Sequence, residues 1–130
     1  MINITPSTVD NLVIATGHGK VTSEDYEATL IPAVQNILRT HSKVRLLYQL
    51  AEDCTGFTPG AMWEDTKLGL GHLSAFEAVA VVTDHAWITE AVKLFGFCMR
   101  CPVKVFHNHE YAEAAQWAAT TPAWRALAEV

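Results

Sequence analysis

The sequence predicts an α/β protein with a mostly parallel five-stranded sheet and flanking helices, in the order β-β-α-β-α-β-α-β-α. Three observations lead to this prediction. Short, almost continuous apolar runs recur along the chain, as strands buried on both faces require. Amphipathic segments with helix start signals separate those runs. The length of 130 residues, half of them hydrophobic, suits one core, so we expect a single domain over residues 1–130.

The first two strands are predicted close to the amino terminus. Ile2 and Ile4 alternate with polar residues ahead of Pro6, and an apolar run then covers residues 11–17. Because the connection between the two runs is short, we expect the first strand to pair antiparallel with the second.

The first helix is predicted to begin at Thr22, which can form a capping box with Asp25 three residues further on. Pro32 lies inside this helix, where it removes one backbone hydrogen bond and should bend the helix. Apolar residues at spacings of three and four give the helix one buried stripe: Tyr26, Leu30, Ala33, Val34, Ile37 and Leu38.

The rest of the chain continues the alternation of strands and helices. Asp84 and Asn108 are the expected N-caps of the helices that follow them. Strictly alternating elements imply parallel strands joined by right-handed crossovers. The remaining strands are predicted over residues 44–50, 78–83 and 103–106, and the remaining helices over 59–70, 86–97, 109–119 and from 122 onward.

Charge and composition exclude several classes of function. The net charge of −5 repels nucleic acid, so no nucleic-acid partner is expected. The first residues lack the basic and apolar regions of a secretory signal, and no apolar run is long enough to span a bilayer. Three cysteines, an odd and low number, suit a reducing compartment. We therefore expect a cytoplasmic protein.

Three segments carry a resemblance to a known family. They are residues 62–67 (Met-Trp-Glu-Asp-Thr-Lys), residues 79–84 (Val-Ala-Val-Val-Thr-Asp) ahead of Trp87, and residues 103–106 leading into 112–117. Together with the order of elements, these segments make the chain resemble the SpoIIAA-like family, whose fold is shared with STAS domains. The resemblance implies a sheet of successive strand–helix turns. It also implies a functional edge at the loop after the third strand and at the second helix.

The same resemblance raises the question of a phosphorylation site. STAS proteins that act as anti-anti-sigma switches are phosphorylated on a serine within an Asp-Ser-Ser-Gly-like run at the start of this second helix. The matching residues are 57–60, so the resemblance implies Thr58 as the modified residue, although Phe57 and Pro59 depart from the pattern. A phosphate at that helix N-terminus would be electrostatically favourable. The alternative is that Thr58 serves only as the N-cap.

No catalytic motif is present. The sequence lacks a GxSxG elbow, a P-loop and a GxGxxG motif, so a non-enzymatic protein without a cofactor is expected. Cys98 and Cys101, with His107 and His109, have the composition of a zinc site. However, an intervening strand would separate the two pairs by roughly 20 Å, too far for one metal ion. We therefore expect no metal, and a cysteine of this pair packed as a small apolar residue.

The most informative segment for function is the predicted third helix. Between residues 87 and 100 only Glu90, Lys93 and Arg100 are charged, and apolar positions cover more than half of the helix circumference. Three explanations remain open: mutual packing of the helices, a homodimer interface, or an apolar pocket or membrane-facing surface with the basic residues beside it.

The leading hypothesis is a non-enzymatic cytoplasmic binding or regulatory module. It would take a small apolar or amphipathic, lipid-like ligand between the second and third helices, in some settings at a membrane surface. The expected ligand-binding residues are Trp63, Trp87, Val92 and Phe95, which would line the site, and Lys67 and Lys93, which would orient a polar end. The alternative is a STAS-like regulator that docks a partner protein through residues 51–60 and the second helix.

Overall fold

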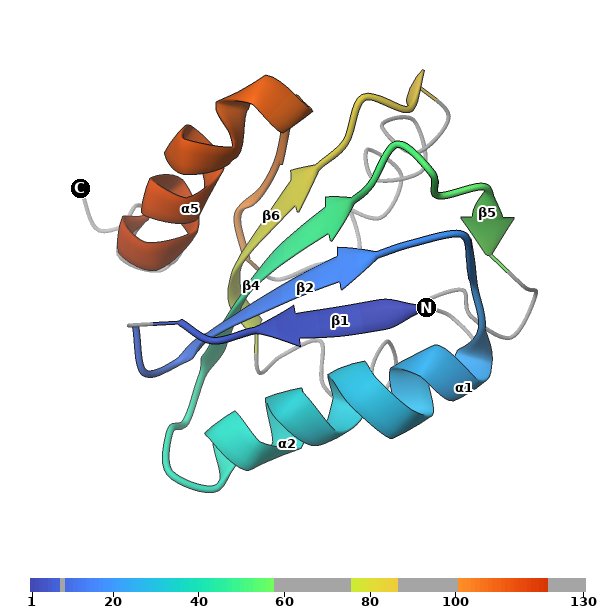
Figure 1. The fold of residues 1–130 in the computed structure, drawn as a ribbon. Coiled ribbons are helices and arrows are strands. Elements are labelled where there is room, and N and C mark those ends of the chain that lie inside the picture. Colours follow the sequence, from blue (N-terminus) through green and yellow to red (C-terminus); the bar gives the residue numbers. More distant parts are fainter. Residues whose placement is uncertain (8, 58–75, 87–100, 122–130) are drawn as a thin grey trace.

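The computed structural model describes residues 1–7, 9–57, 76–86 and 101–121. Within these ranges five strands form one mixed sheet in the order β1-β2-β4-β6-β7 (Figure 1). β1 pairs antiparallel with β2, and every other neighbouring pair is parallel. The strands are β1 (Ile2–Thr5), β2 (Leu12–Gly17), β4 (Val44–Leu50), β6 (Phe76–Val82) and β7 (Val103–Phe106). The predicted α/β fold class is confirmed.

The strand boundaries follow the apolar runs, with one correction. β6 begins at Phe76 and ends at Val82, whereas the sequence predicted residues 78–83. A register shift opposite Val44 lets Phe76 join the sheet, where it is only 2% exposed. Thr83 lies just beyond the strand, and its N–H donates to the carbonyl of Phe106 at 2.8 Å.

The first helical segment begins where the sequence predicts. The N–H of Thr22 donates to the Asp25 carboxylate at 2.8 Å, and the N–H of Asp25 donates to the Thr22 hydroxyl at 3.2 Å. This reciprocal pair is the expected capping box. Burial raises the pKa of Asp25, but the hydrogen bonds from Thr22 and the hydrogen bond and charge of the amino terminus together more than offset it, so the pKa lies below its ordinary value.

Pro32 is accommodated differently from the prediction of one bent helix. The segment consists of α1 (Ser23–Asp25), a π-helical turn η1 (Tyr26–Leu30) and α2 (Ile31–Leu38). The π turn lets a regular helix restart at Ile31, so Pro32 occupies its first turn. A proline at that position loses no intrahelical hydrogen bond, because the first N–H groups of a helix have no partner in it.

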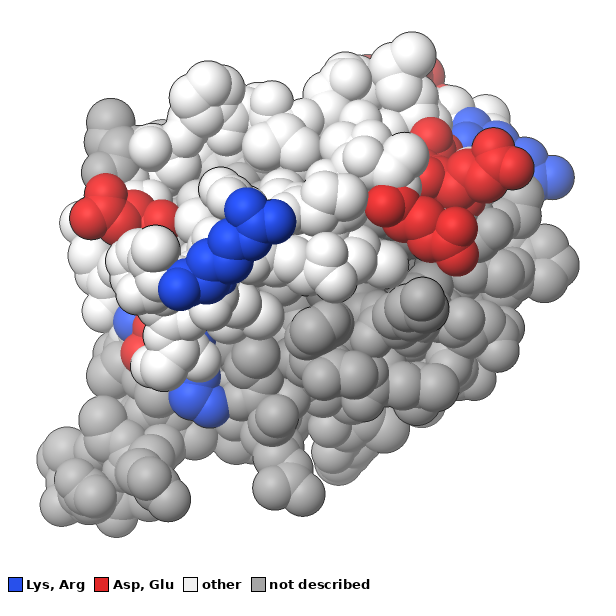
Figure 2. All heavy atoms as spheres, turned by 90° about the horizontal axis from the view of Figure 1, so that it is seen from below, with Lys and Arg blue, Asp and Glu red and all other residues white. Residues whose placement is uncertain are grey.

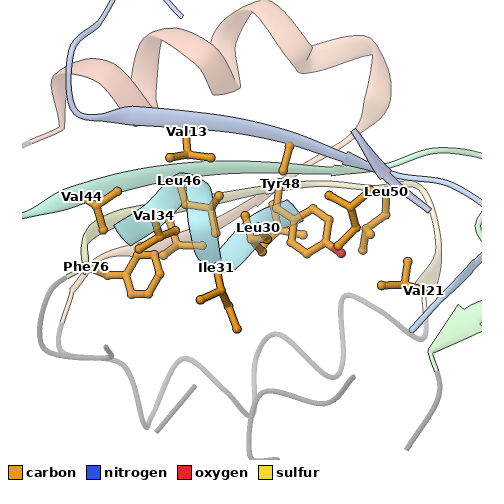
Figure 3. Packing of buried hydrophobic residues seen from close by; sticks show 14 of the residues in the cluster. Val13, Val21, Leu30, Ile31, Val34, Val44, Leu46, Tyr48, Leu50 and Phe76 are labelled. Carbon is orange, nitrogen blue, oxygen red and sulfur yellow. The ribbon is translucent and has the colours of Figure 1, made fainter. Parts of the chain in front are cut away.

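Helices cover both faces of the sheet. η1 and α2 lie on one face, and α5 (Tyr111–Thr120) lies on the other (Figure 1). The α2-side cluster contains large buried side chains that point into the space beside α2, among them Leu30, Val34, Leu46, Tyr48 and Phe76 (Figure 3). The α5-side cluster consists of Leu12, Leu47, Ala80, Val82, Phe106, Ala114 and Ala118.

The start of α5 corrects a second prediction. A 3₁₀ turn, η5 (Asn108–Glu110), precedes α5, and no side-chain bond from Asn108 caps the helix. Instead the Glu110 carboxylate accepts the N–H of His107 at 2.8 Å. The helices predicted over 59–70 and from 122 onward lie outside the described residues, as does nearly all of the one over 86–97. No helix in the described part of the chain has the length and hydropathy to cross a bilayer.

A small second sheet was not predicted. β3 (Lys20–Val21) pairs in parallel with β5 (Gly56–Phe57). Two residues are too few for an alternating pattern to show in the sequence. Gly19 precedes β3 with a φ of +56°, a left-handed conformation that glycine adopts without steric cost.

Candidate functional site

The loops that follow β4, β6 and β7 emerge together, because the carboxyl ends of parallel strands share one edge of a sheet. We call the loops at residues 51–55, 83–86 and 107–110 the carboxyl-edge surface. Polar side chains concentrate in these loops and at the last positions of the strands that lead into them. Ligand sites of parallel α/β proteins typically lie at this edge.

Asp84 is the central group of this surface. Its carboxylate accepts the backbone N–H of Asn108 at 3.1 Å and the side-chain amide of Asn108 at 3.0 Å. It also lies 3.1 Å from Nδ1 of His107. Hydrogen bonds from the backbone and side chain of Asn108, followed by the contact with His107, lower the pKa of Asp84. The carboxylate is therefore charged at neutral pH and joins the loop after β6 to the loop after β7.

Asn108 extends this connection to β4. Its side-chain oxygen accepts a hydrogen bond from the amide of Gln49 at 3.1 Å. Gln49 stands next to the last residue of β4. Three neighbouring strands are thus linked at their carboxyl ends by amide and carboxylate groups, and Asn108 stands between Gln49 and Asp84.

The loop after β4 is joined to the same assembly through His85. Nε2 of His85 lies 3.2 Å from the carbonyl oxygen of Ala51, and because a carbonyl only accepts, this nitrogen carries the proton. The N–H of His85 donates to the hydroxyl of Thr83, which is 1% exposed. The loop is also fixed on its other side, since the N–H of Thr55 donates to the carbonyl of Gly19 at 2.8 Å.

Two imidazole rings project from this framework. The rings of His107 and His109 stack with their centroids 5.5 Å apart and an angle of 7° between their planes. The His107 side chain is 66% exposed. A second exposed pair, His18 and Asp53, lies 3.1 Å apart where the β2–β3 turn meets the loop after β4. The surface therefore presents aromatic, polar side chains on a backbone that many hydrogen bonds hold in place.

The chemistry of these groups suits recognition. The oxygens of Asp84 are engaged by His107 and Asn108, so its carboxylate supports the loop. Among the described residues, no three histidine, cysteine, aspartate or glutamate side chains are grouped as a metal site requires. β7 separates Cys101 from His107, and Cys101 is buried, as one cysteine of the pair was expected to be.

The strand order has a further consequence for ligand type. From β2 to β4, β6 and β7, each parallel strand adds on the same side of the one before it. Doubly wound sheets bind nucleotides in the crevice where this direction reverses. The described strand order contains no such reversal, so it provides an exposed edge of loops in place of a crevice.

The residues singled out by sequence reasoning lie elsewhere. Trp63, Lys67, Trp87, Val92, Lys93, Phe95 and Thr58 all fall outside the described residues. Sequence reasoning missed the bond from Asp84 to Asn108, 24 positions away, while the helix that Asp84 was expected to cap lies almost entirely outside the described residues. The available signal was positional: Asp84 and Asn108 each follow an apolar run, and neighbouring parallel strands end at one edge.

Comparison with known proteins identifies the fold. Residues 12–119 match the sequence profile of the SpoIIAA-like family. The chain is also similar to a solved structure, an uncharacterized protein of the DUF3478 family with a SpoIIAA-like fold from Shewanella loihica PV-4. The two share 25% sequence identity and a TM-score of 0.67, over 91% of this chain and 92% of that one. No curated protein matches the chain.

Proposed function

The chain belongs to the SpoIIAA-like family, and from that premise we propose that it is a non-catalytic module that docks a partner protein through the carboxyl-edge surface. One observation carries the proposal: Asp84, Asn108 and His85 fix three loops as a single surface from which His107 and His109 project. The proposal retains the first part of the 51–60 loop expected from the sequence and adds the loops after β6 and β7.

The fixed loops favour binding for an entropic reason. A surface that is already ordered does not lose loop entropy when a partner binds, so more of the contact free energy appears as affinity. Histidine rings and side-chain amides can then form hydrogen bonds and stacking contacts with a protein surface. This arrangement supports docking over a reaction, because the groups stabilise one another and the exposed rings are left for the partner.

Charge indicates the chemistry of the partner. The three loops contain Glu52, Asp53, Asp84 and Glu110 and no lysine or arginine. The nearby helical segment adds Glu24 and Glu27, and Figure 2 shows the larger group of acidic residues on one side of the described surface, with a basic residue beside it. A partner with a basic face would be attracted to this end of the molecule and its association accelerated.

The test compares partner capture by the immobilised full chain and by two variants. His107→Ala/His109→Ala removes both exposed rings, and Gln35→Ala is a matched control at an exposed position of α2. We expect a partner recovered with the wild type and the control, and recovered about tenfold less with the double variant, because a few residues near the centre of an interface carry most of its affinity. Equal recovery with all three proteins, at unchanged melting temperatures, would contradict the proposal.

A second candidate function is the apolar or amphipathic ligand between residues 59–70 and 86–97, with Trp63, Trp87, Val92 and Phe95 lining it and Lys67 or Lys93 at its polar end. The observation that favours it is compositional, namely the few charges between residues 87 and 100. Native mass spectrometry before and after organic extraction distinguishes the two functions. An extractable adduct supports the ligand, and a clean mass favours protein docking.

A further inference from the structure

The edge strand β1 has an outer edge with which no described strand pairs. β1 lies at one end of the sheet order, and its residues Asn3, Ile4 and Thr5 are exposed. Among the described residues, the large hydrophobic side chains that are exposed are Met1 (62%) and Ile4 (39%), and both lie on this strand or next to it.

The hydrogen bonds to β2 show which backbone groups of β1 face outward. The Met1 carbonyl accepts the N–H of His18 at 2.8 Å, in line with the register that pairs Ile2 with Gly17. In an antiparallel pair, alternate residues bond to the neighbouring strand. Met1 and Asn3 therefore bond to β2, while Ile2 and Ile4 direct their N–H and carbonyl groups to the open edge.

The opposite edge of the sheet is protected against pairing. β7 carries the exposed Lys104 and follows Pro102, which has no N–H. Charged side chains and proline are the features that keep edge strands from pairing. β1 contains neither within Ile2–Thr5, and Pro6 limits it only after Thr5. Of the two edges formed by the described strands, β1 is therefore the unprotected one. A sheet with one unprotected edge can close as a dimer, whereas two unprotected edges would allow filaments.

We propose that a second copy of this chain pairs antiparallel with β1 about a twofold axis at Asn3, joining the two sheets into one. Ile2 of each copy then faces Ile4 of the other. Each of these two pairs exchanges two backbone hydrogen bonds, because their N–H and carbonyl groups already face outward. A twofold axis at Ile4 would place Pro6 opposite Ile2 and lose donors, so the pairing centred on Asn3 is favoured.

The pairing also accounts for the exposed side chains. Ile2 and Ile4 lie on one face of β1, so the exposed Ile4 of one copy would pack beside Ile2 of the other. The two Asn3 side chains meet on the opposite face and can bond to each other. Because each copy carries a net charge of −5, the copies repel at long range, and the dimer should strengthen as salt increases. The carboxyl-edge surface stays free, since β4, β6 and β7 lie away from β1.

Sedimentation equilibrium of the full chain tests the dimer. Ile4→Lys adds a charge to the edge, and Ile4→Pro removes an outward N–H without removing a bond to β2. Both should raise the dissociation constant at least tenfold with little loss of helical circular dichroism. Gln116→Lys, an equal charge change at an exposed position of α5, should leave the dimer intact. A monomeric wild type at about 100 µM, or Ile4 variants that dimerise like the wild type, would overturn the proposal.

Disulfide trapping tests the register. At a non-hydrogen-bonded antiparallel pair the two Cα atoms lie about 4.5 Å apart, within the range that a disulfide spans. Asn3→Cys in a Cys98→Ser background should therefore form a covalent dimer under mild oxidation. Thr5→Cys in the same background should not, because its two copies would lie roughly 13 Å apart. Efficient cross-linking through Thr5→Cys, or none through Asn3→Cys, would contradict the pairing centred on Asn3.

Discussion

The two faces of the sheet are stabilised in different ways. On the α2 side, large aliphatic and aromatic residues such as Leu30, Leu46 and Phe76 fill the space between helix and sheet. On the α5 side, the fully buried residues that the helix contributes are two alanines, Ala114 and Ala118, while its large side chains Tyr111 and Trp117 pack against the cluster only partly buried. The α2 face is therefore stabilised mainly by buried apolar volume.

α5 compensates with polar contacts at both of its ends. At its start, Asp84 holds Asn108 in the turn that leads into the helix. At its end, Nη1 of Arg45 donates to the carbonyl of Ala118 at 2.9 Å, while Nε of Arg45 donates to Glu77 at 2.9 Å. A cation beside the last carbonyl groups also interacts favourably with the helix dipole. The comparison shows that a helix whose fully buried residues are small can be positioned in part by polar contacts at its two ends.

The largest expected effect comes from the α2 face, and β4 offers a matched pair of residues to measure it. Leu46 and Leu47 are adjacent and equally buried, but they point to the α2 and α5 faces respectively. Leu46→Ala should lower the free energy of unfolding by about 4 kcal/mol, because rigid neighbours leave the cavity open. Leu47→Ala should cost about 2 to 3 kcal/mol, because α5 can move toward the sheet. Urea unfolding gives both values, and a larger loss for Leu47→Ala would reverse the comparison.

The second expected effect concerns the anchor at the end of α5. Arg45→Met leaves the half-buried Glu77 carboxylate without its cation and the Ala118 carbonyl without its donor. We expect a loss of about 2 kcal/mol in the free energy of unfolding. The double variant Arg45→Met/Glu77→Met should recover part of that loss, because no unpaired charge remains. A double variant as unstable as the sum of the single ones would show that the two side chains act independently.

The third expected effect is smaller and depends on pH. The pKa of Asp84 lies below its ordinary value of 3.8, so the charged carboxylate favours the folded state above that pH. This contribution is lost as the pH falls through the lowered pKa. Asp84→Asn should therefore lower the melting temperature at pH 7, and the difference from the wild type should shrink below pH 4. Hydrogen exchange should locate the effect in the first turn of α5; a difference that persists unchanged at pH 2 would exclude this linkage.

The last prediction concerns the chemical reactivity of the two thiols in the α2-side cluster and involves no change in stability. Burial raises the pKa of the Cys101 thiol to about 11, and burial likewise raises that of Cys54. Since the thiolate is the reactive form, iodoacetamide at pH 8 should modify both cysteines far more slowly than a model thiol. Peptide mapping in a urea series should show modification only as the protein unfolds. Rapid modification of either thiol in the native protein would show that the α2 face opens locally.

Sequence reasoning succeeded where the signal is local. The apolar runs located β2, β4 and β7, and the Thr22–Asp25 box marked the start of the first helix, because both patterns lie within a few residues. It failed where the signal is spread along the chain. The bond between Asp84 and Asn108 depends on which strands become neighbours, and no local pattern encodes that.

Two further differences have physical causes. Pro32 indicated that one regular helix could not pass through its position, but the sequence did not indicate which irregularity would occur. The π turn η1 follows from the backbone path into α2. β3 and β5 exist because the loop after β4 passes beside residues 20–21, an arrangement fixed by tertiary structure. The ligand-binding residues expected from the sequence stay a prediction.

The strand order has a consequence for how the molecule can be made. β2 pairs with β1, β4 with β2, β6 with β4, and β7 with β6, so each strand has as its neighbour one that precedes it in the chain. A ribosome releases a chain from its amino terminus, and domains begin to fold as they emerge. Each new strand therefore finds its template already exposed, and the sheet can grow vectorially during synthesis without waiting for residues still to be translated.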